Sequence, residues 1–152
     1  MQSDGKPCQG QGAAPHSTLP SGQVQVAVVG AHLLCLPLNH QLTDRGGRLI
    51  AATKTASQYR LYALPDGKRS GLIRVENGGA AIDCEVWELP LVEFGSFVVS
   101  IQAPLGIGRI ELDDGSRVNG FICEAVAVQT ARDITPFGDR RRWLAHVEHH
   151  GK

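Results

Sequence analysis

The architecture of this chain follows from one stretch, Val26-Ala27-Val28-Val29-Gly30-Ala31-His32-Leu33, with Pro37-Leu38-Asn39 close behind it. The apolar, β-branched residues are typical of a buried strand, and Gly30 is typical of the turn that ends one. Beyond the turn, consecutive backbone N–H groups and the imidazole of His32 can face one point, an arrangement that binds small anions. A plain turn explains the same residues, so both interpretations remain open.

Size and charge exclude several classes of protein. The 152 residues suit one domain with a buried core. The 15 basic and 15 acidic side chains cancel, so we expect neither nucleic acid nor membrane as a partner. No charged-then-apolar signal pattern opens the chain, and we therefore expect a cytoplasmic protein.

Metal and cofactor sites are not expected. The four cysteines match no zinc-binding spacing, and the terminal histidines 146, 149 and 150 have no acidic or cysteine partner at ligand spacing. Phosphate-binding glycine motifs and the hydrolase Gly-x-Ser-x-Gly motif are also missing from the sequence. Residues 140–142, three arginines, are interpreted as a solvated helix face.

Turn signals divide the chain into short elements. Residues 1–23 are polar and rich in glycine and are predicted to be disordered, and residues 146–152 are predicted to fray. Strands are predicted at 24–29, 48–55, 59–64, 72–75, 81–89, 109–112 and 118–124, with a loop at 102–108. One amphipathic helix is predicted at 90–101, with shorter helices at 37–45 and 136–147. The pattern predicts a mostly β, α+β fold over residues 24–145: a small closed or nearly closed barrel with one main packed helix and short peripheral helices.

A series of motifs in this order and spacing resembles the C-terminal domain of allophanate hydrolase. They are Val28–Leu33, Pro37–Leu42, Thr53–Ala56, Tyr59–Tyr62, Glu85–Pro90, Ala103–Gly108, Asp114–Gly115, Gly120–Glu124 and Arg132–Gly138. That family is similar in fold to the γ-glutamylcyclotransferases, whose Tyr-Gly-Ser-Leu substrate loop corresponds to Gly30–Leu33. The resemblance implies a stand-alone domain that breaks down a small N-carboxylated carbamate or urea intermediate to carbon dioxide and ammonia. It also implies a separate amidase as the partner that supplies this substrate.

Two segments depart from the family pattern. Leu34-Cys35-Leu36 stands where such domains usually have Ser-Gly-Met, and Gly138-Asp139-Arg140-Arg141 stands where they have Gly-Gly-Trp-Arg. The first change removes a polar group beside the expected pocket. A pocket blocked by Leu34 and Leu36 would favour a non-catalytic ligand-binding or assembly module on the same fold. Cyclotransferase activity is a third alternative, and it needs a pocket carboxylate that the sequence does not offer after the main helix.

His32 and Glu85 are predicted as the catalytic residues, and the resemblance strengthens the case for His32. Decarboxylation requires a proton for the nitrogen as the C–N bond breaks, and an imidazole can deliver it near neutral pH. Glu85 shares a strand face with Trp87, so it is the better placed of two strand carboxylates, the other being Glu124. The alternatives are a histidine bonded to its own turn and a glutamate paired with a nearby arginine.

The remaining candidates are substrate-binding residues. Backbone groups of Gly30, Ala31 and Leu33 would hold a carboxylate, and Asn39 and Gln41 would add amide contacts or cap a helix. Tyr59 is placed in the pocket and Tyr62 in the core, because two residues three apart on a strand face opposite sides. Arg109 and Glu124 would contact the ends of the substrate, or else form surface ion pairs. The oligomeric state stays open, a homodimer among the options.

Overall fold

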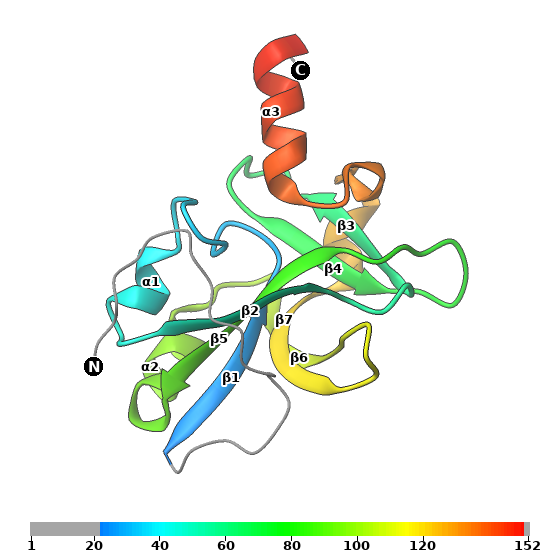
Figure 1. Cartoon of the computed structure of the whole chain (residues 1–152). Helices are drawn as coiled ribbons and strands as arrows, with labels where there is room; N and C mark the ends of the chain where they lie inside the picture. Colours follow the sequence, from blue (N-terminus) through cyan, green and yellow to red (C-terminus); the bar gives the residue numbers. More distant parts are fainter. Residues whose placement is uncertain (1–21, 151–152) are drawn as a thin grey trace.

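Eight strands form two sheets in the computed structural model, which describes residues 22–150 (Figure 1). The larger sheet has five strands in the order β2-β5-β1-β7-β6, and the smaller has three in the order β4-β3-β8. The bounds are β1 Gln23–Val28, β2 Arg48–Lys54, β3 Tyr59–Ala63, β4 Ser70–Arg74, β5 Asp83–Pro90, β6 Leu105–Glu111, β7 Arg117–Cys123 and β8 Arg132–Asp133.

Strand β1 lies at the centre of the larger sheet and separates two cores. It runs antiparallel to β5, with Val28 opposite Glu85, and parallel to β7. Since successive side chains point to opposite faces, Ala27 belongs to the core shared with the smaller sheet, and Val26 and Val28 belong to the core under the helices. Because both faces of β1 are covered, its successive residues are apolar instead of alternating between apolar and polar.

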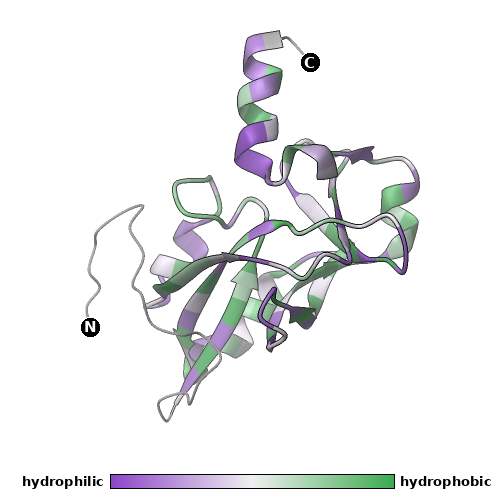
Figure 2. Cartoon of the chain, turned by 45° about the vertical axis from the view of Figure 1, so that its right-hand side comes forward, coloured by the Kyte–Doolittle hydropathy of each residue, from purple (hydrophilic) through white to green (hydrophobic). Residues whose placement is uncertain are grey.

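The helices divide between packed and projecting elements. Helix α2, Leu91–Ser100, packs against β5 and β1 through Phe97, which is fully buried. The short helix α1, His40–Thr43, contributes Leu42 to the same core. The 3-10 helices η1, Ala125–Gln129, and η2, Thr135–Phe137, lead to α3, Arg140–His150, which projects from the sheets in Figure 1. Figure 2 shows hydrophobic residues concentrated in the sheets, whereas much of α3 is hydrophilic.

The larger sheet curls but is not a closed barrel. Its two edges meet at an isolated bridge between Thr55 and Leu112, just beyond the ends of β2 and β6. Two further backbone bonds, from Ala56 N to Glu111 O and from Asp113 N to Lys54 O, hold the edges together there. The mostly β, α+β class is confirmed, and the closed version of the barrel is wrong because pairing between the edges stops after this one point.

Several element boundaries differ from those predicted. Strand β6 begins at Leu105, inside the predicted loop, and β8 lies in a segment where no strand was predicted. Helix α3 continues to His150, past residue 146, where fraying was predicted. The predicted disordered segment 1–23 lies outside the described residues except for Gly22 and Gln23.

Among the described residues, no helix is both long and apolar enough to span a membrane.

Candidate functional site

The loop after β1 folds back on itself and leaves two N–H groups without an acceptor among the described residues. Leu33 N donates to Gly30 O at 3.0 Å, and Leu38 N donates to Ala31 O at 2.9 Å. The backbone N–H groups of Ala31 and His32 find no acceptor within residues 22–150. Cys35 lies further along the loop at φ 72°, a left-handed conformation that glycine adopts more easily. The loop therefore keeps a glycine-like bend at a position where a glycine is typical of the family pattern.

His32 is buried between two aromatic rings. It is 7% exposed, stacks on Phe121 with ring centroids 4.6 Å apart, and meets Phe97 edge to face at 5.8 Å. Its Nε2 lies 2.7 Å from Gln41 Oε1. Asn39 Nδ2 donates to the carbonyl of His32 at 2.8 Å. Both amides thus fix the histidine from the side of α1.

The surroundings of His32 favour its neutral form in the empty site. Burial lowers the pKa of His32 from its ordinary value of 6.5, and the hydrogen bond to Gln41 partly opposes this effect. With Gln41 Oε1 as acceptor, Nε2 carries the proton and Nδ1 is left to take a second one. An anion bound nearby would favour the imidazolium, so proton uptake and anion binding are coupled at this residue.

A narrow pocket lies beside His32. Its walls combine the β1 loop with β4, the start of β6 and β7; they are Val29, Gly30, Ala31, His32, Arg69, Ser70, Leu105 and Phe121. Gly30 is needed at this wall, because a Cβ there would lie only 3.2 Å from Ser70 Cβ. Arg69 is held by Asp66 and by the carbonyls of Gln102 and Ala103. The pocket combines one imidazole, one guanidinium and free N–H groups, and no carboxylate lines it.

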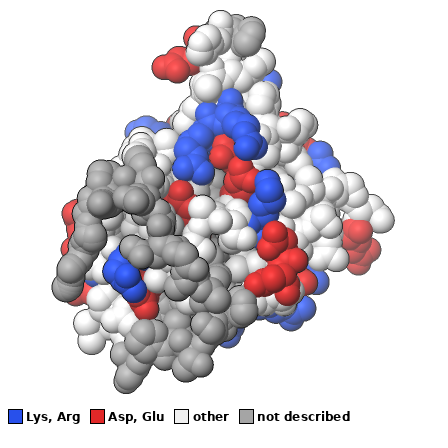
Figure 3. Space-filling view, viewed as in Figure 1, with Lys and Arg blue, Asp and Glu red and all other residues white. Residues whose placement is uncertain are grey.

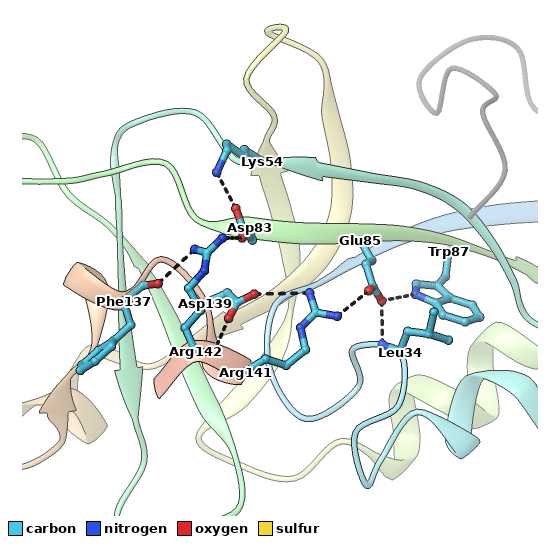
Figure 4. A network of polar contacts seen from close by, with 9 residues as sticks. All are labelled: Leu34, Lys54, Asp83, Glu85, Trp87, Phe137, Asp139, Arg141 and Arg142. Carbon is cyan, nitrogen blue, oxygen red and sulfur yellow. Dashed lines mark hydrogen bonds and ion pairs between the residues drawn. The ribbon is translucent and has the colours of Figure 1, made fainter. Parts of the chain in front are cut away.

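Glu85 supports the loop from the other side (Figure 4). Its side chain is buried, and its Oε1 accepts hydrogen bonds from Leu34 N at 2.8 Å and Trp87 Nε1 at 3.1 Å. Its Oε2 accepts from Arg141 Nη1 at 3.2 Å. All of these partners belong to the protein itself, so Glu85 ties the β1 loop to β5 and to the base of α3.

Charged residues at the base of α3 continue this network. Arg141 also bonds Asp139 Oδ2 at 3.4 Å, and Arg142 pairs with Asp83 at 3.3 Å. In Figure 3, basic and acidic side chains gather side by side below the projecting helix. Arg140 is only 4% exposed. The prediction of a solvated face therefore holds for Arg142 alone, because the first turn of α3 packs against the sheets.

The structure brings some of the predicted site residues together. Gly30, Ala31 and His32 line the pocket. Asn39 and Gln41 contact His32, and Asn39 makes no side-chain cap of α1, so the capping alternative is wrong.

The other candidates lie away from this pocket, and their roles stay predictions. Leu33 is fully buried in the core under the helices. Tyr59 is buried in the other core with its hydroxyl bonded to Glu111 N, and Tyr62 is the half-buried one of the two tyrosines. Arg109 and Glu124 are exposed. Glu85 is buried but lies outside the pocket lining.

Arg69, Ser70 and Phe121 are pocket residues that sequence reasoning missed. Arg69 and Ser70 follow the turn after β3, and Phe121 lies within an ordinary β7 pattern. These residues lie near His32 because the smaller sheet packs against the larger one. No local sequence motif predicts that packing.

Comparisons with known proteins agree with this architecture. The allophanate hydrolase C-terminal domain family matches residues 24–145. Urea amidolyase of Saccharomyces cerevisiae is 39% identical over 131 residues, which cover 82% of this chain and 7% of that protein. The chain thus spans a small fraction of the curated relatives it matches.

Solved structures give the same picture. Kluyveromyces lactis allophanate hydrolase is 42% identical, with a TM-score of 0.78 over 82% of this chain and 21% of that one. The uropathogenic E. coli-specific protein c4763 is 36% identical, with a TM-score of 0.77 over 82% of this chain and 97% of that one. PH0828 from Pyrococcus horikoshii, at 18% identity and a TM-score of 0.66, shares the fold alone. The chain belongs to the allophanate hydrolase C-terminal domain family.

Proposed function

We propose that this chain breaks down a small N-carboxylated carbamate in allophanate and urea nitrogen metabolism, releasing carbon dioxide and ammonia. The observation that carries the proposal is the buried His32 at the wall of a cationic pocket that has free N–H groups. A substrate of this class carries carboxylates on nitrogen, and both features suit it. Turn N–H groups and Arg69 bind a carboxylate, and the imidazole faces the nitrogen that must gain a proton.

The reaction requires one C–N bond to break with its electron pair left on nitrogen. The departing carboxylate becomes carbon dioxide, and the proton on His32 Nδ1 passes to the nitrogen. Gln41 keeps Nε2–H as a donor and so directs the transferable proton to Nδ1. Water then restores the proton to His32. The carbamate formed takes one further proton from solvent as its own C–N bond breaks, and it leaves as carbon dioxide and ammonia.

The narrow pocket must widen to take such a substrate. Its enclosed volume of about 10 Å³ is close to the space of one water molecule. The Arg69 side chain, 23% exposed and anchored to a turn and to the carbonyls before β6, can rotate without disturbing either core. Arg69 thus combines two proposed roles, binding a carboxylate and closing the site over it.

Two alternatives are less well supported. Leu34 and Leu36 pack as half-buried residues against the core under the helices and do not line the pocket, so they do not block it as a non-catalytic module would require. Cyclotransferase chemistry lacks its pocket carboxylate, because Glu85 is engaged elsewhere.

A separate amidase and the cytoplasm are the proposed partner and location. Relatives named urea amidolyase contain this domain as a small part of a longer chain. We propose that an amidase supplies the substrate to this domain as a small diffusing molecule.

The test is coupled turnover. The purified chain is added to an allophanate-hydrolysing amidase that lacks its second domain, and the release of ammonia and carbon dioxide is followed against the amidase alone. We expect faster release with the wild-type chain and none of this increase with His32→Asn. His149→Asn, on exposed α3, is the matched histidine control and should behave as wild type.

Each other outcome is informative. No increase with the wild-type chain would overturn the proposed reaction and favour the module. An increase that survives His32→Asn would keep the reaction and remove His32 from its role as proton donor.

A further inference from the structure

Arg140 is a buried cation that forms no ion pair with any described residue. Its guanidinium donates to Ser70 Oγ at 2.9 Å and to Gly67 O at 3.3 Å, and its Nε has no hydrogen-bond acceptor. Asp66, an acid whose charge acts on Arg140, is itself held by Arg69 at 2.7 Å. Burying an unpaired charge costs several kcal/mol. A bound anion close to Arg140 would offset this cost, so the arrangement favours an anion site here.

The neighbourhood contains a second unsatisfied donor. Trp143 Nε1 is buried without an acceptor, and the Arg140 guanidinium lies 5.5 Å from the centre of the Trp143 ring. Buried donors are satisfied in most folded proteins. Two unsatisfied donors in one place mark a donor-rich region rather than a random defect.

Ser70 connects this region to the pocket. It is 4% exposed, begins β4, and lines the pocket opposite Gly30. A serine hydroxyl has one donor position and can accept two hydrogen bonds. Because Ser70 Oγ accepts the bond from Arg140, its own proton remains available, and no acceptor for it occurs among residues 22–150.

We infer that Ser70 and Arg140 together recognise the second carboxylate of a dianionic substrate. The Ser70 hydroxyl donates to that carboxylate inside the pocket, while Arg140 behind it supplies positive charge through the shared hydrogen bond. The first carboxylate goes to the free N–H groups of the β1 loop. This inference deepens the proposed function and rests on it for the substrate class: a small dicarboxylate rather than a monocarboxylate.

Arg140 is accordingly a specificity-determining residue and does not touch the reacting atoms. The charge of Arg140 acts on the bound carboxylate through the side chain of Ser70. Both residues are buried, and electrostatic interactions are stronger in a buried site than in water. A dianion gains more from that charge than a monoanion does. The expected result of losing Arg140 is therefore a loss of preference for dicarboxylates, with proton transfer from His32 unchanged.

The test compares the binding of malonate with the binding of acetate. Malonate resembles the N-carboxylated carbamate, with a methylene in place of the N–H between the two carboxylates, and acetate is the matching monocarboxylate. Calorimetry is performed on the wild-type chain, on Ser70→Ala and on Arg140→Gln. Arg142→Gln is the matched control, because Arg142 lies on the same helix with a 61% exposed side chain. Arg140→Met, an uncharged side chain of similar length, keeps the test valid if Arg140→Gln does not fold.

We expect malonate to bind about tenfold more weakly to Ser70→Ala and to the Arg140 variants, a loss of about 1.4 kcal/mol. Acetate binding should change less than threefold, and Arg142→Gln should match wild type. The double variant should be no weaker than the single variants, since the two residues act as one unit. Malonate binding that is absent from the wild-type chain, or unchanged by Ser70→Ala and Arg140→Met in folded protein, overturns the inference.

This result is separable from the fate of the proposed reaction. If coupled turnover is observed but malonate binding does not depend on Ser70 and Arg140, only the inference is wrong. If malonate binding depends on both residues but no turnover is observed, the proposed reaction is wrong and the dicarboxylate site stands.

Discussion

Replacing Glu85 should reveal how the β1 loop is held in place. Its Oε1 accepts two hydrogen bonds from neutral donors, Leu34 N and Trp87 Nε1, and its Oε2 accepts one from Arg141. Glu85→Ala leaves both neutral donors without an acceptor in a buried site. At about 1–3 kcal/mol for each, and allowing for partial rearrangement of the loop, the free energy of unfolding should fall by about 3 kcal/mol.

Glu85→Gln should cost much less. A glutamine oxygen can accept from both Leu34 N and Trp87 Nε1 as Oε1 does now. Only the charge-assisted bond to Arg141 is lost, and the 39% exposed side chain of Arg141 can return to water. We expect a loss of about 1 kcal/mol for this variant.

Urea unfolding followed by far-UV circular dichroism measures both changes. Glu88→Ala serves as the control, because Glu88 is a comparably buried glutamate on the same strand whose single ion pair is with a half-exposed Arg48. That variant should lose no more than about 1 kcal/mol. The reasoning is refuted if the free energy of unfolding of Glu85→Ala is within about 0.5 kcal/mol of the wild-type value, which is the order of the measurement error. It is also refuted if the glutamine variant is as unstable as the alanine variant.

Four further predictions concern the titration of His32 and two glycines. Because burial lowers the pKa of His32, the unfolded chain binds its proton more readily; stability should therefore fall as the pH drops below 6.5, and urea titrations of His32→Asn should lack that part of the loss. Gln41→Leu removes the hydrogen bond that raises this pKa, so the NMR titration of His32 should move to lower pH. Gly95→Ala should stabilise the chain by about 1 kcal/mol in thermal unfolding, because open space surrounds this helical position. Gly120→Ala should destabilise it by about 1–3 kcal/mol, since the new Cβ would lie 2.9 Å from Ala27 O.

Local patterns predicted the parts of the fold that depend on local chemistry. The apolar run before Gly30 predicted β1. The three- and four-residue spacing of apolar residues predicted α2; they are Leu91, Phe94, Phe97, Val98 and Ile101. The placement of Glu85 beside Trp87 also follows from strand alternation alone, and the structure adds that their side chains bond. These features need no knowledge of which elements meet in space.

Features that depend on long-range packing were not predictable in the same way. The beginning of β6 contains Gly106 and Gly108, which have low strand propensity, and it becomes a strand only because β7 pairs with it. Arg140 looks like a solvated residue in any window of charged sequence. It is buried because α3 begins directly against the smaller sheet, where Ser70 accepts its hydrogen bond.

The central position of β1 governs the timing of folding. This strand is made first, yet one of its two neighbours, β7, comes near the end of the domain; Asn119 lies 94 residues after Gln25, whose carbonyl it bonds. At a synthesis rate of about 5–20 residues per second, the first strand waits on the order of 5–20 s for this neighbour. During that interval its apolar residues and strand edge are available to other chains. High contact order of this kind slows folding, so a chaperone or a fused upstream domain that shields residues 23–29 would raise the yield of native protein more than any added stability would.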